Sequence, residues 1–142
     1  MENLEIKAPV SELKANGMLH LKVYTKQDVL SLTKLRRFET KLGERLQVIH
    51  NAADIAKSIA SSSAKYVLFG VPEDLGAKGN FGIGGADTLW IPFLQSLLNI
   101  QSNDFFDGGE VLLAGHFDFG DIEYLIDTTA RGQEEKIEAY RH

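Results

Sequence analysis

The sequence predicts an α/β fold with a parallel sheet, and three observations lead to this class. Residues 66–71 (YVLFGV) and 110–115 (EVLLAG) are short, mostly apolar runs rich in strand-forming residues. Between them, residues 87–98 carry apolar side chains at helical spacing, and residues 134–140 begin another helical pattern. A strand, helix, strand, helix order is typical of parallel sheets with right-handed crossovers. Because the first run lacks polar alternation, we expect a central strand there, buried on both faces.

The first 65 residues are expected to hold one strand and two helices. Residues 19–24 alternate apolar and polar side chains, as a half-buried strand does. Apolar residues recur at spacings of three and four over residues 35–49, which predicts an amphipathic helix. Gly43 is an alternative end for this helix and would leave residues 46–49 extended. A second helix is expected over residues 52–61.

Charge is divided unevenly along the chain of 142 residues. Residues 1–65 carry eleven Lys and Arg against seven Asp and Glu, a net +4, whereas residues 66–142 carry four against thirteen, a net −9. The sum of −5 argues against binding to nucleic acid or to an anionic membrane surface. The chain has no cysteine, and no apolar run approaches the roughly 18 residues of a membrane span. We therefore expect a cytoplasmic protein whose site lies in the second part, which holds eleven of the thirteen glycines.

A glycine-rich loop, residues 73–87, joins the first apolar run to the helix that follows. Open α/β sheets place ligands at such strand-to-helix connections. Nucleotide-binding motifs nevertheless do not fit, because Lys78 lacks the spacing of a phosphate-binding P-loop. Gly82 and Gly84 match the start of a dinucleotide fingerprint, but Asp87 occupies the position of its third glycine and would repel a pyrophosphate. The other interpretation is a loop that needs glycine for its backbone angles.

His116, Asp118 and Asp121 form an acidic exit from the second strand. A His-x-Asp pair at a strand end is a possible ligand set for a divalent metal. The competing interpretation is a tight turn in which the aspartates accept hydrogen bonds from backbone N–H groups. No Gly-x-Ser-x-Gly nucleophile motif occurs in the chain.

Residues 65–121 resemble the N-terminal part of the ureohydrolase superfamily, which comprises arginases, agmatinases and formimidoylglutamases. The resemblance is carried in order by residues 66–74 (YVLFGVPED), 80–90 (NFGIGGADTLW), 99–103 (NIQSN) and 115–119 (GHFDF). The amino-acid sequences of the first and third segments are similar to those of the formimidoylglutamase-like branch.

The resemblance implies a three-layer α-β-α parallel-sheet fold and hydrolysis of a C–N bond in formimidoylglutamate, arginine or agmatine. In that family the nucleophile is a hydroxide bridging two Mn²⁺ ions, which lower the pKa of the shared water. The family's metal-ligand motifs, among them Asp-x-His-x-Asp, do not occur in these 142 residues. The resemblance therefore implies an N-terminal, truncated portion of a homo-oligomeric enzyme, with no bound Mn²⁺ and no activity alone. It transfers no catalytic or metal-ligating residue to this chain.

Two segments follow from the resemblance: an N-terminal extension over residues 1–64, and the start of the arginase-like domain over residues 65–142. The glycine-rich loop would border the active-site mouth of the whole enzyme. Its expected substrate-side residues are Asn80, Phe81, Gly84 and Gly85. The alternative is a noncatalytic α/β module that binds an anion or a partner chain through residues 73–87 and an open sheet edge.

Overall fold

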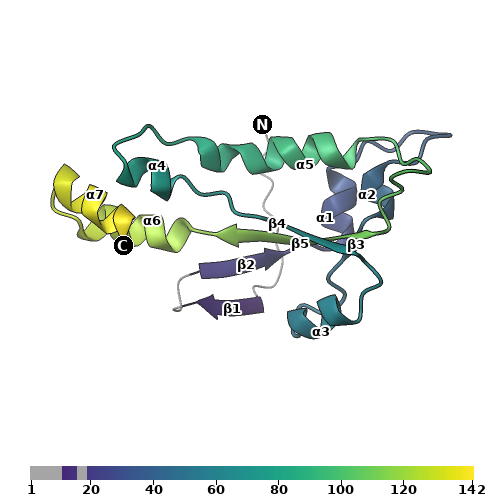
Figure 1. Ribbon diagram of the computed structural model, residues 1–142, viewed down its shortest axis with the longest axis horizontal. Coiled ribbons are helices and arrows are strands. Elements are labelled where there is room, and N and C mark those ends of the chain that lie inside the picture. Colours follow the sequence, from purple (N-terminus) through teal and green to yellow (C-terminus); the bar gives the residue numbers. More distant parts are fainter. Residues whose placement is uncertain (1–10, 16–18) are drawn as a thin grey trace.

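The computed structural model describes residues 11–15 and 19–142 of the chain. These residues form one five-stranded mixed sheet (Figure 1). Its strands are β1 (Ser11–Ala15), β2 (Leu19–Val23), β3 (Gln47–Val48), β4 (Tyr66–Gly70) and β5 (Val111–Asp118). Strands β3 and β4 run parallel to β5, whereas β2 runs antiparallel to it and to β1. The α/β class is confirmed, but the expected parallel sheet is wrong because β2 enters it in the opposite direction.

Helices cover both faces of this sheet. They are α1 (Lys26–Ser31), α2 (Leu42–Arg45), α3 (Ile55–Ala60), α4 (Leu75–Gly79), the 3₁₀ helix η1 (Ala86–Leu89), α5 (Trp90–Leu98), α6 (Gly120–Thr129) and α7 (Gln133–Arg141). Helices α1, α2 and α5 lie on one side of the sheet and α3 on the other (Figure 1). No helix of the described part of the chain is both long and apolar enough to cross a bilayer.

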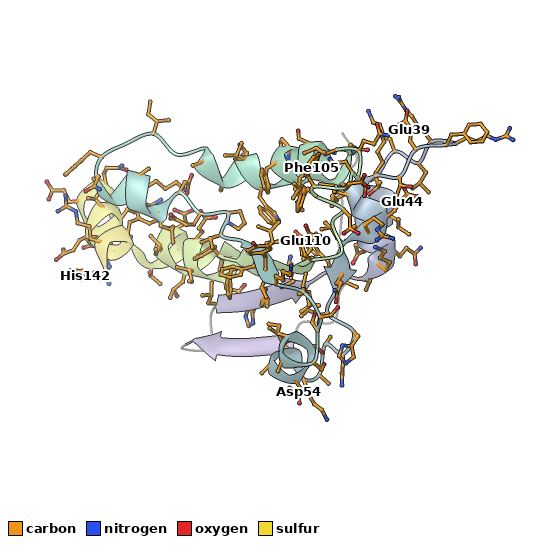
Figure 2. All side chains as sticks on the ribbon, turned by 45° about the vertical axis from the view of Figure 1, so that its right-hand side comes forward. Glu39, Glu44, Asp54, Phe105, Glu110 and His142 are labelled. Carbon is orange, nitrogen blue, oxygen red and sulfur yellow. The ribbon has the colours of Figure 1, made fainter. Side chains whose placement is uncertain are left out.

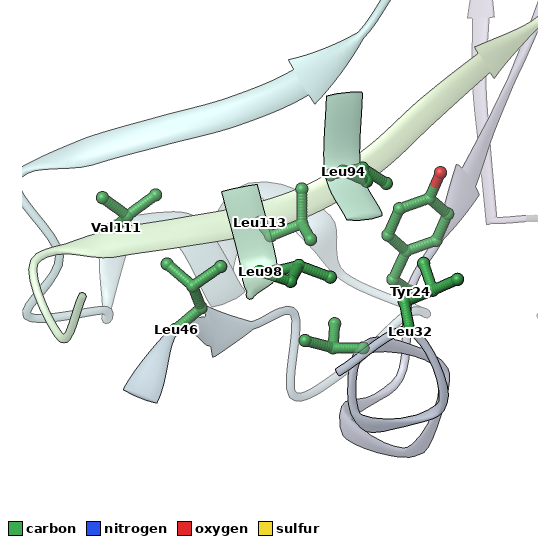
Figure 3. Packing of buried hydrophobic residues seen from close by; sticks show 8 residues of the cluster. Tyr24, Leu32, Leu46, Leu94, Leu98, Val111 and Leu113 are labelled. Carbon is green, nitrogen blue, oxygen red and sulfur yellow. The ribbon is translucent and has the colours of Figure 1, made fainter. Parts of the chain in front are cut away.

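The core is built around β5, whose successive side chains enter opposite faces. Val111 and Leu113 join the cluster formed with α1 and α5, and the packing of this cluster around β5 is visible in Figure 3. Leu112 and Ala114 join the second cluster, which includes Ile55 of α3. This two-sided burial is what a central strand requires. The strand predicted over residues 110–115 is thus confirmed and is the centre of the sheet.

Strand β4 forms where predicted, but its predicted burial on both faces is wrong. Within the described residues it pairs only with β5, and Tyr66, Val67 and Phe69 are exposed. A continuous apolar run indicates that a segment favours a β-sheet, but it does not determine how many strands lie beside that segment. Both edges of β5 are occupied, whereas one edge of β4 has no neighbour among the described residues.

The helix predicted over residues 35–49 is also wrong. The chain is irregular up to Lys41, forms the single turn α2, and then extends as β3. Leu35 is exposed, while Leu42 and Leu46 reach the core from α2 and its end. Gly43 lies inside α2, where its lack of a side chain leaves room for the Thr33 hydroxyl, which a Cβ would overlap. The alternative ending, with an extended segment after Gly43, describes this region better.

The other predictions need smaller corrections. The strand over residues 19–24 and the helix over 134–140 correspond to β2 and α7, and the helix over 87–98 to η1 and α5. Helix α3 begins later than expected, capped by Asp54, whose carboxylate accepts from the Lys57 N–H at 3.0 Å. The loop 73–87 contains α4, and α6 was not predicted at all.

Candidate functional site

The candidate site lies where β4 and β5 end, because ligands of α/β sheets gather at the carboxyl ends of parallel strands. Two groups of polar side chains are built from the segments at and after these strand ends. The first, the aromatic relay, consists of Tyr24, Trp90 and His116. The second is the network around the buried carboxylate of Asp74.

The aromatic relay is a chain of two hydrogen bonds. The Trp90 indole N–H donates to the Tyr24 hydroxyl at 2.7 Å, and that hydroxyl is hydrogen-bonded to Nδ1 of His116 at 2.5 Å. Tyr24 is fully buried after β2, and Trp90 lies directly against Gly70 at the end of β4, where a Cβ would overlap the indole ring. The relay therefore connects three separate elements at one end of the sheet.

The buried surroundings of the relay determine the protonation states of Tyr24 and His116. Burial raises the pKa of Tyr24 to about 12, so its hydroxyl keeps its proton. Burial also lowers the pKa of His116, and the positive charge of Lys22 acts in the same direction against the opposing charge of Asp118. The Tyr24 hydroxyl already accepts from Trp90, so its own proton has an acceptor in this chain of hydrogen bonds when Nδ1 of His116 is unprotonated. On this assignment the proton of the neutral His116 ring is on Nε2. His116 thus carries a fixed N–H donor at the carboxyl end of β5.

Replacing Tyr24 by phenylalanine is expected to lower the free energy of unfolding by about 2 kcal/mol, because two polar groups lose their partner. The Trp90 N–H and the His116 Nδ1 would both remain in a mostly buried place. The matched control is Tyr66→Phe, whose ring is largely exposed and whose effect should stay within about 0.5 kcal/mol. Urea unfolding of both variants measures the difference. Equal effects would show that the relay adds nothing to stability.

Stability should also depend on the protonation of His116. Its pKa is lowered in the folded chain, so the unfolded chain binds a proton more readily as the pH falls through about 6.5. The contribution of the neutral ring is complete above that pH and is lost as the pH falls toward the folded-state pKa. Over this pH window, the free energy of unfolding should depend less on pH in His116→Gln than in the original chain. His50→Gln, at an exposed position, is the control for replacing a histidine by glutamine.

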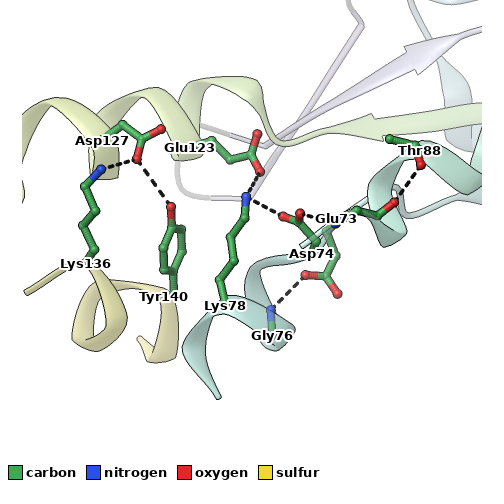
Figure 4. Close-up of polar contacts among 10 residues, drawn as sticks. Glu73, Asp74, Gly76, Lys78, Thr88, Glu123, Asp127, Lys136 and Tyr140 are labelled. Atoms are coloured by element: carbon green, nitrogen blue, oxygen red, sulfur yellow. Dashed lines mark hydrogen bonds and ion pairs between the residues drawn. The ribbon is translucent and has the colours of Figure 1, made fainter. Parts of the chain in front are cut away.

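Asp74 is the centre of the second group (Figure 4). Its carboxylate lies 2.7 Å from the ammonium group of Lys78 and accepts a hydrogen bond from the Gly85 N–H at 2.9 Å. Lys78 also lies 3.3 Å from the Glu123 carboxylate on α6. The hydrogen bond from Lys78 lowers the pKa of Asp74, although burial opposes this shift. The network ties the glycine-rich loop to the helix that follows β5.

The four residues expected on the substrate side lie in two places. Gly84 and Gly85 lie against Asp74. A Cβ on Gly84 would overlap the Asp74 carboxylate, and Gly85 has a φ of 129°, a backbone conformation that favours glycine. Asn80 and Phe81 are exposed and lie toward the C-terminal helix, where the Arg141 guanidinium is 5.2 Å from the centre of the Phe81 ring.

Asp74 was not predicted as a site residue, although it is the last residue of the segment 66–74 that carries the family resemblance. Its burial depends on Lys78 and Gly85, which lie four and eleven residues away. The relay was also missed, because Tyr24 and His116 are separated by 92 positions. No local pattern identifies such partners.

The possible metal ligands His116, Asp118 and Asp121 are not brought together. His116 bonds to Tyr24, and Asp118 lies 3.0 Å from the Lys22 ammonium group. Asp121 lies 3.3 Å from His20 Nε2. Among the side chains that the structure describes, in residues 19–142, no three His, Asp or Glu converge as a metal site.

An open, polar pocket of about 870 Å³ lies at the other end of the sheet. Figure 2 shows two of its lining residues, Phe105 and Glu110, away from His142. Its charges are mixed, and Arg45 is already paired with Asp107 at 2.7 Å. This pocket therefore offers no focused charge for a ligand.

The carboxyl end of the sheet remains the stronger candidate, since it combines a fixed imidazole N–H with a glycine loop held by a buried carboxylate. Such groups can orient a polar ligand by hydrogen bonding. No family model, curated protein or solved structure matches this chain.

Proposed function

We propose that this chain is the N-terminal segment of a binuclear-manganese hydrolase that acts on C–N bonds of formimidoyl or guanidino compounds in the cytoplasm. The supporting observation is the ordered resemblance of residues 66–74, 80–90 and 115–119 to the ureohydrolases. These segments correspond to β4, the glycine loop with α5, and the end of β5, which form a parallel pair with a crossover helix. On this proposal the sheet is the start of a three-layer, arginase-like fold.

The residues described here supply no ligand set for Mn²⁺. The ions would be held by the family's own aspartate and histidine motifs, which these 142 residues lack. When bound, a manganese pair supplies a metal-activated hydroxide at neutral pH. The part of this chain is to shape the site: Asp74 holds the glycine loop through Gly85, and the relay orients the His116 ring in β5.

The test begins with the coding sequence after codon 142 and uses the whole encoded protein. With Mn²⁺, we expect release of formamide from formimidoylglutamate, or of urea from arginine or agmatine, and loss of this activity on chelation. Gly84→Ala should reduce activity because its Cβ displaces Asp74, whereas Gly76→Ala, which meets open space, should not. A folded, manganese-treated protein without hydrolysis of any of the three substrates would contradict the proposal.

A second candidate function is a noncatalytic interaction module. It is favoured by the open edge of β4, which exposes apolar side chains that a neighbouring strand would cover. Size-exclusion chromatography with mass measurement distinguishes this function from the hydrolase proposal. An interaction module should associate with another chain and should show no manganese-dependent hydrolysis.

A further inference from the structure

The open pocket of about 870 Å³ has a lining that suits a neutral polar ligand. It lies where β4 and β5 begin, since Lys65 directly precedes β4 and Glu110 directly precedes β5. Figure 2 labels Glu110 and Phe105, which both line it. The volume is within the range of small-molecule sites, roughly 300–1,000 Å³. The pocket is therefore large enough for a ligand, and its lining decides which kind.

Phe105 presents an exposed aromatic ring at this pocket, on a turn that the chain holds closed. The Asn103 side-chain oxygen accepts from the N–H groups of Phe105 and Phe106 at 2.9 and 3.0 Å. The Asn103 N–H in turn donates to the Phe106 carbonyl at 3.2 Å. Phe106 packs against the core cluster of α1 and α5, whereas Phe105 is 100% exposed. The Phe105 ring is thus a flat apolar surface that no part of the described chain covers.

The base of the same loop is also fixed. The Asp107 carboxylate lies 2.7 Å from the Arg45 guanidinium, and the Asp107 carbonyl accepts from the Ser102 hydroxyl at 2.8 Å. The Gln47 side-chain amide donates to the Gly109 carbonyl at 2.7 Å. Because these contacts order the loop before any ligand arrives, binding costs little conformational entropy.

Three side chains of the lining have hydrogen-bonding capacity left for a ligand. The Ser63 hydroxyl accepts from the Gln47 amide at 3.0 Å, which leaves its own proton to donate. Among the described residues, the Lys65 ammonium and the Asp104 carboxylate form no ion pair. The pocket thus offers two donors and an acceptor. A hydroxyl group, which both donates and accepts, can bond to each of them.

The charges of the lining argue against an anionic ligand. They are two cations and three carboxylates, a net charge of −1: Arg45, Lys65, Asp104, Asp107 and Glu110. A phosphate or a nucleotide would meet more repulsion than attraction here. An entirely apolar ligand would strip water from Lys65 and Asp104 without replacing its hydrogen bonds. A sugar ring avoids both costs, because it carries hydroxyl groups at its rim and C–H groups on its faces.

We propose that this pocket binds a neutral carbohydrate of one or two rings. One face of a sugar ring packs on Phe105, and the sugar hydroxyls exchange hydrogen bonds with Ser63, Lys65 and Asp104. This site is at the opposite end of the sheet from the glycine loop, and it does not depend on manganese chemistry.

Amide NMR spectra of the 142-residue chain, recorded with maltose, cellobiose or lactose, test the site. We expect at least one sugar to shift the signals of residues 102–110, with a Kd of about 1 mM. Phe105→Ala should weaken binding about tenfold, because it removes the apolar surface. Phe81→Ala is the matched control, since its ring is also largely exposed but lies at the other end of the sheet. Its effect should stay within about threefold.

Asp104→Leu provides a second variant of similar size without an acceptor, and it should also weaken binding about tenfold. The spectrum of each variant shows whether it is folded. No shift with any of the three sugars, or binding that both pocket variants leave unchanged, would overturn the proposal.

The choice of a neutral ligand is tested by comparing glucose with glucose 6-phosphate at low ionic strength. The phosphate should bind at least about threefold more weakly, because the carboxylates of the lining repel it. Salt should leave the affinity for glucose unchanged. Tighter binding of the phosphate, weakening as salt is added, would identify an anion site and refute the assignment. All these titrations are made without manganese, so their failure and the failure of the hydrolase proposal are distinguishable.

Discussion

Replacing Gly115 by alanine is expected to destabilise the folded chain by about 4 kcal/mol, the largest effect of any single substitution considered. Gly115 has a φ of 146°, a backbone conformation that disfavours a side chain. A Cβ at this position would also overlap the carbonyl oxygen of Lys22 in the neighbouring strand β2. Because the obstacle is backbone in a paired strand, it cannot move away without breaking the pairing of β2 with β5.

The position of Gly115 explains why it is so sensitive. The register between β4 and β5 shifts here, since Leu68 pairs with Leu113 but Phe69 pairs with Gly115. The next residue, His116, belongs to the aromatic relay. Urea unfolding measures the effect, and Gly76→Ala, which meets open space in α4, is the control with an expected change within about 1 kcal/mol. A Gly115→Ala variant as stable as this control would show that the close contact with β2 is relieved without cost.

Leu113→Ala should lower the free energy of unfolding by about 3 kcal/mol, the second largest effect. The Leu113 side chain is fully buried between α1, α5 and the sheet, so its removal leaves a cavity. The rigid surroundings of a central strand close such a cavity only in part.

Val67→Ala on β4 is the informative comparison for Leu113→Ala. Both positions belong to short apolar runs, yet Val67 is 42% exposed at the open edge. We expect a loss within about 1 kcal/mol in urea unfolding. Comparable losses at the two positions would contradict the assignment of β5 as the central strand and β4 as an edge.

The expected elements that formed are those with strong local signals. The apolar runs became β4 and β5, and the spacing over residues 87–98 became η1 and α5. The failed helix over residues 35–49 had the right periodicity, but its apolar side chains are shared among an exposed loop, α2 and β3. Helical spacing therefore identified residues that reach the core without identifying the elements that carry them.

The candidate site was only partly predictable. The glycine loop marked its position, because glycine is needed where the chain wraps closely around a buried group. Gly84 and Gly85 do so around Asp74. An open sheet edge was expected, but the aromatic relay and the position of β4 at that edge had no local signal, since each depends on which distant segments lie next to β5.

By itself, the sequence determined the α/β class, most strand and helix positions in its second part, and the location of the glycine loop. These features follow from apolar periodicity and from glycine content, which act over a few neighbouring residues. Only the tertiary structure decided that β5 is central and β4 is an edge, that β2 runs antiparallel, and that Tyr24 connects Trp90 to His116. The physical reason is that strand order and buried hydrogen bonds depend on contacts between residues far apart in the chain, and a side chain's own neighbours in sequence do not encode them.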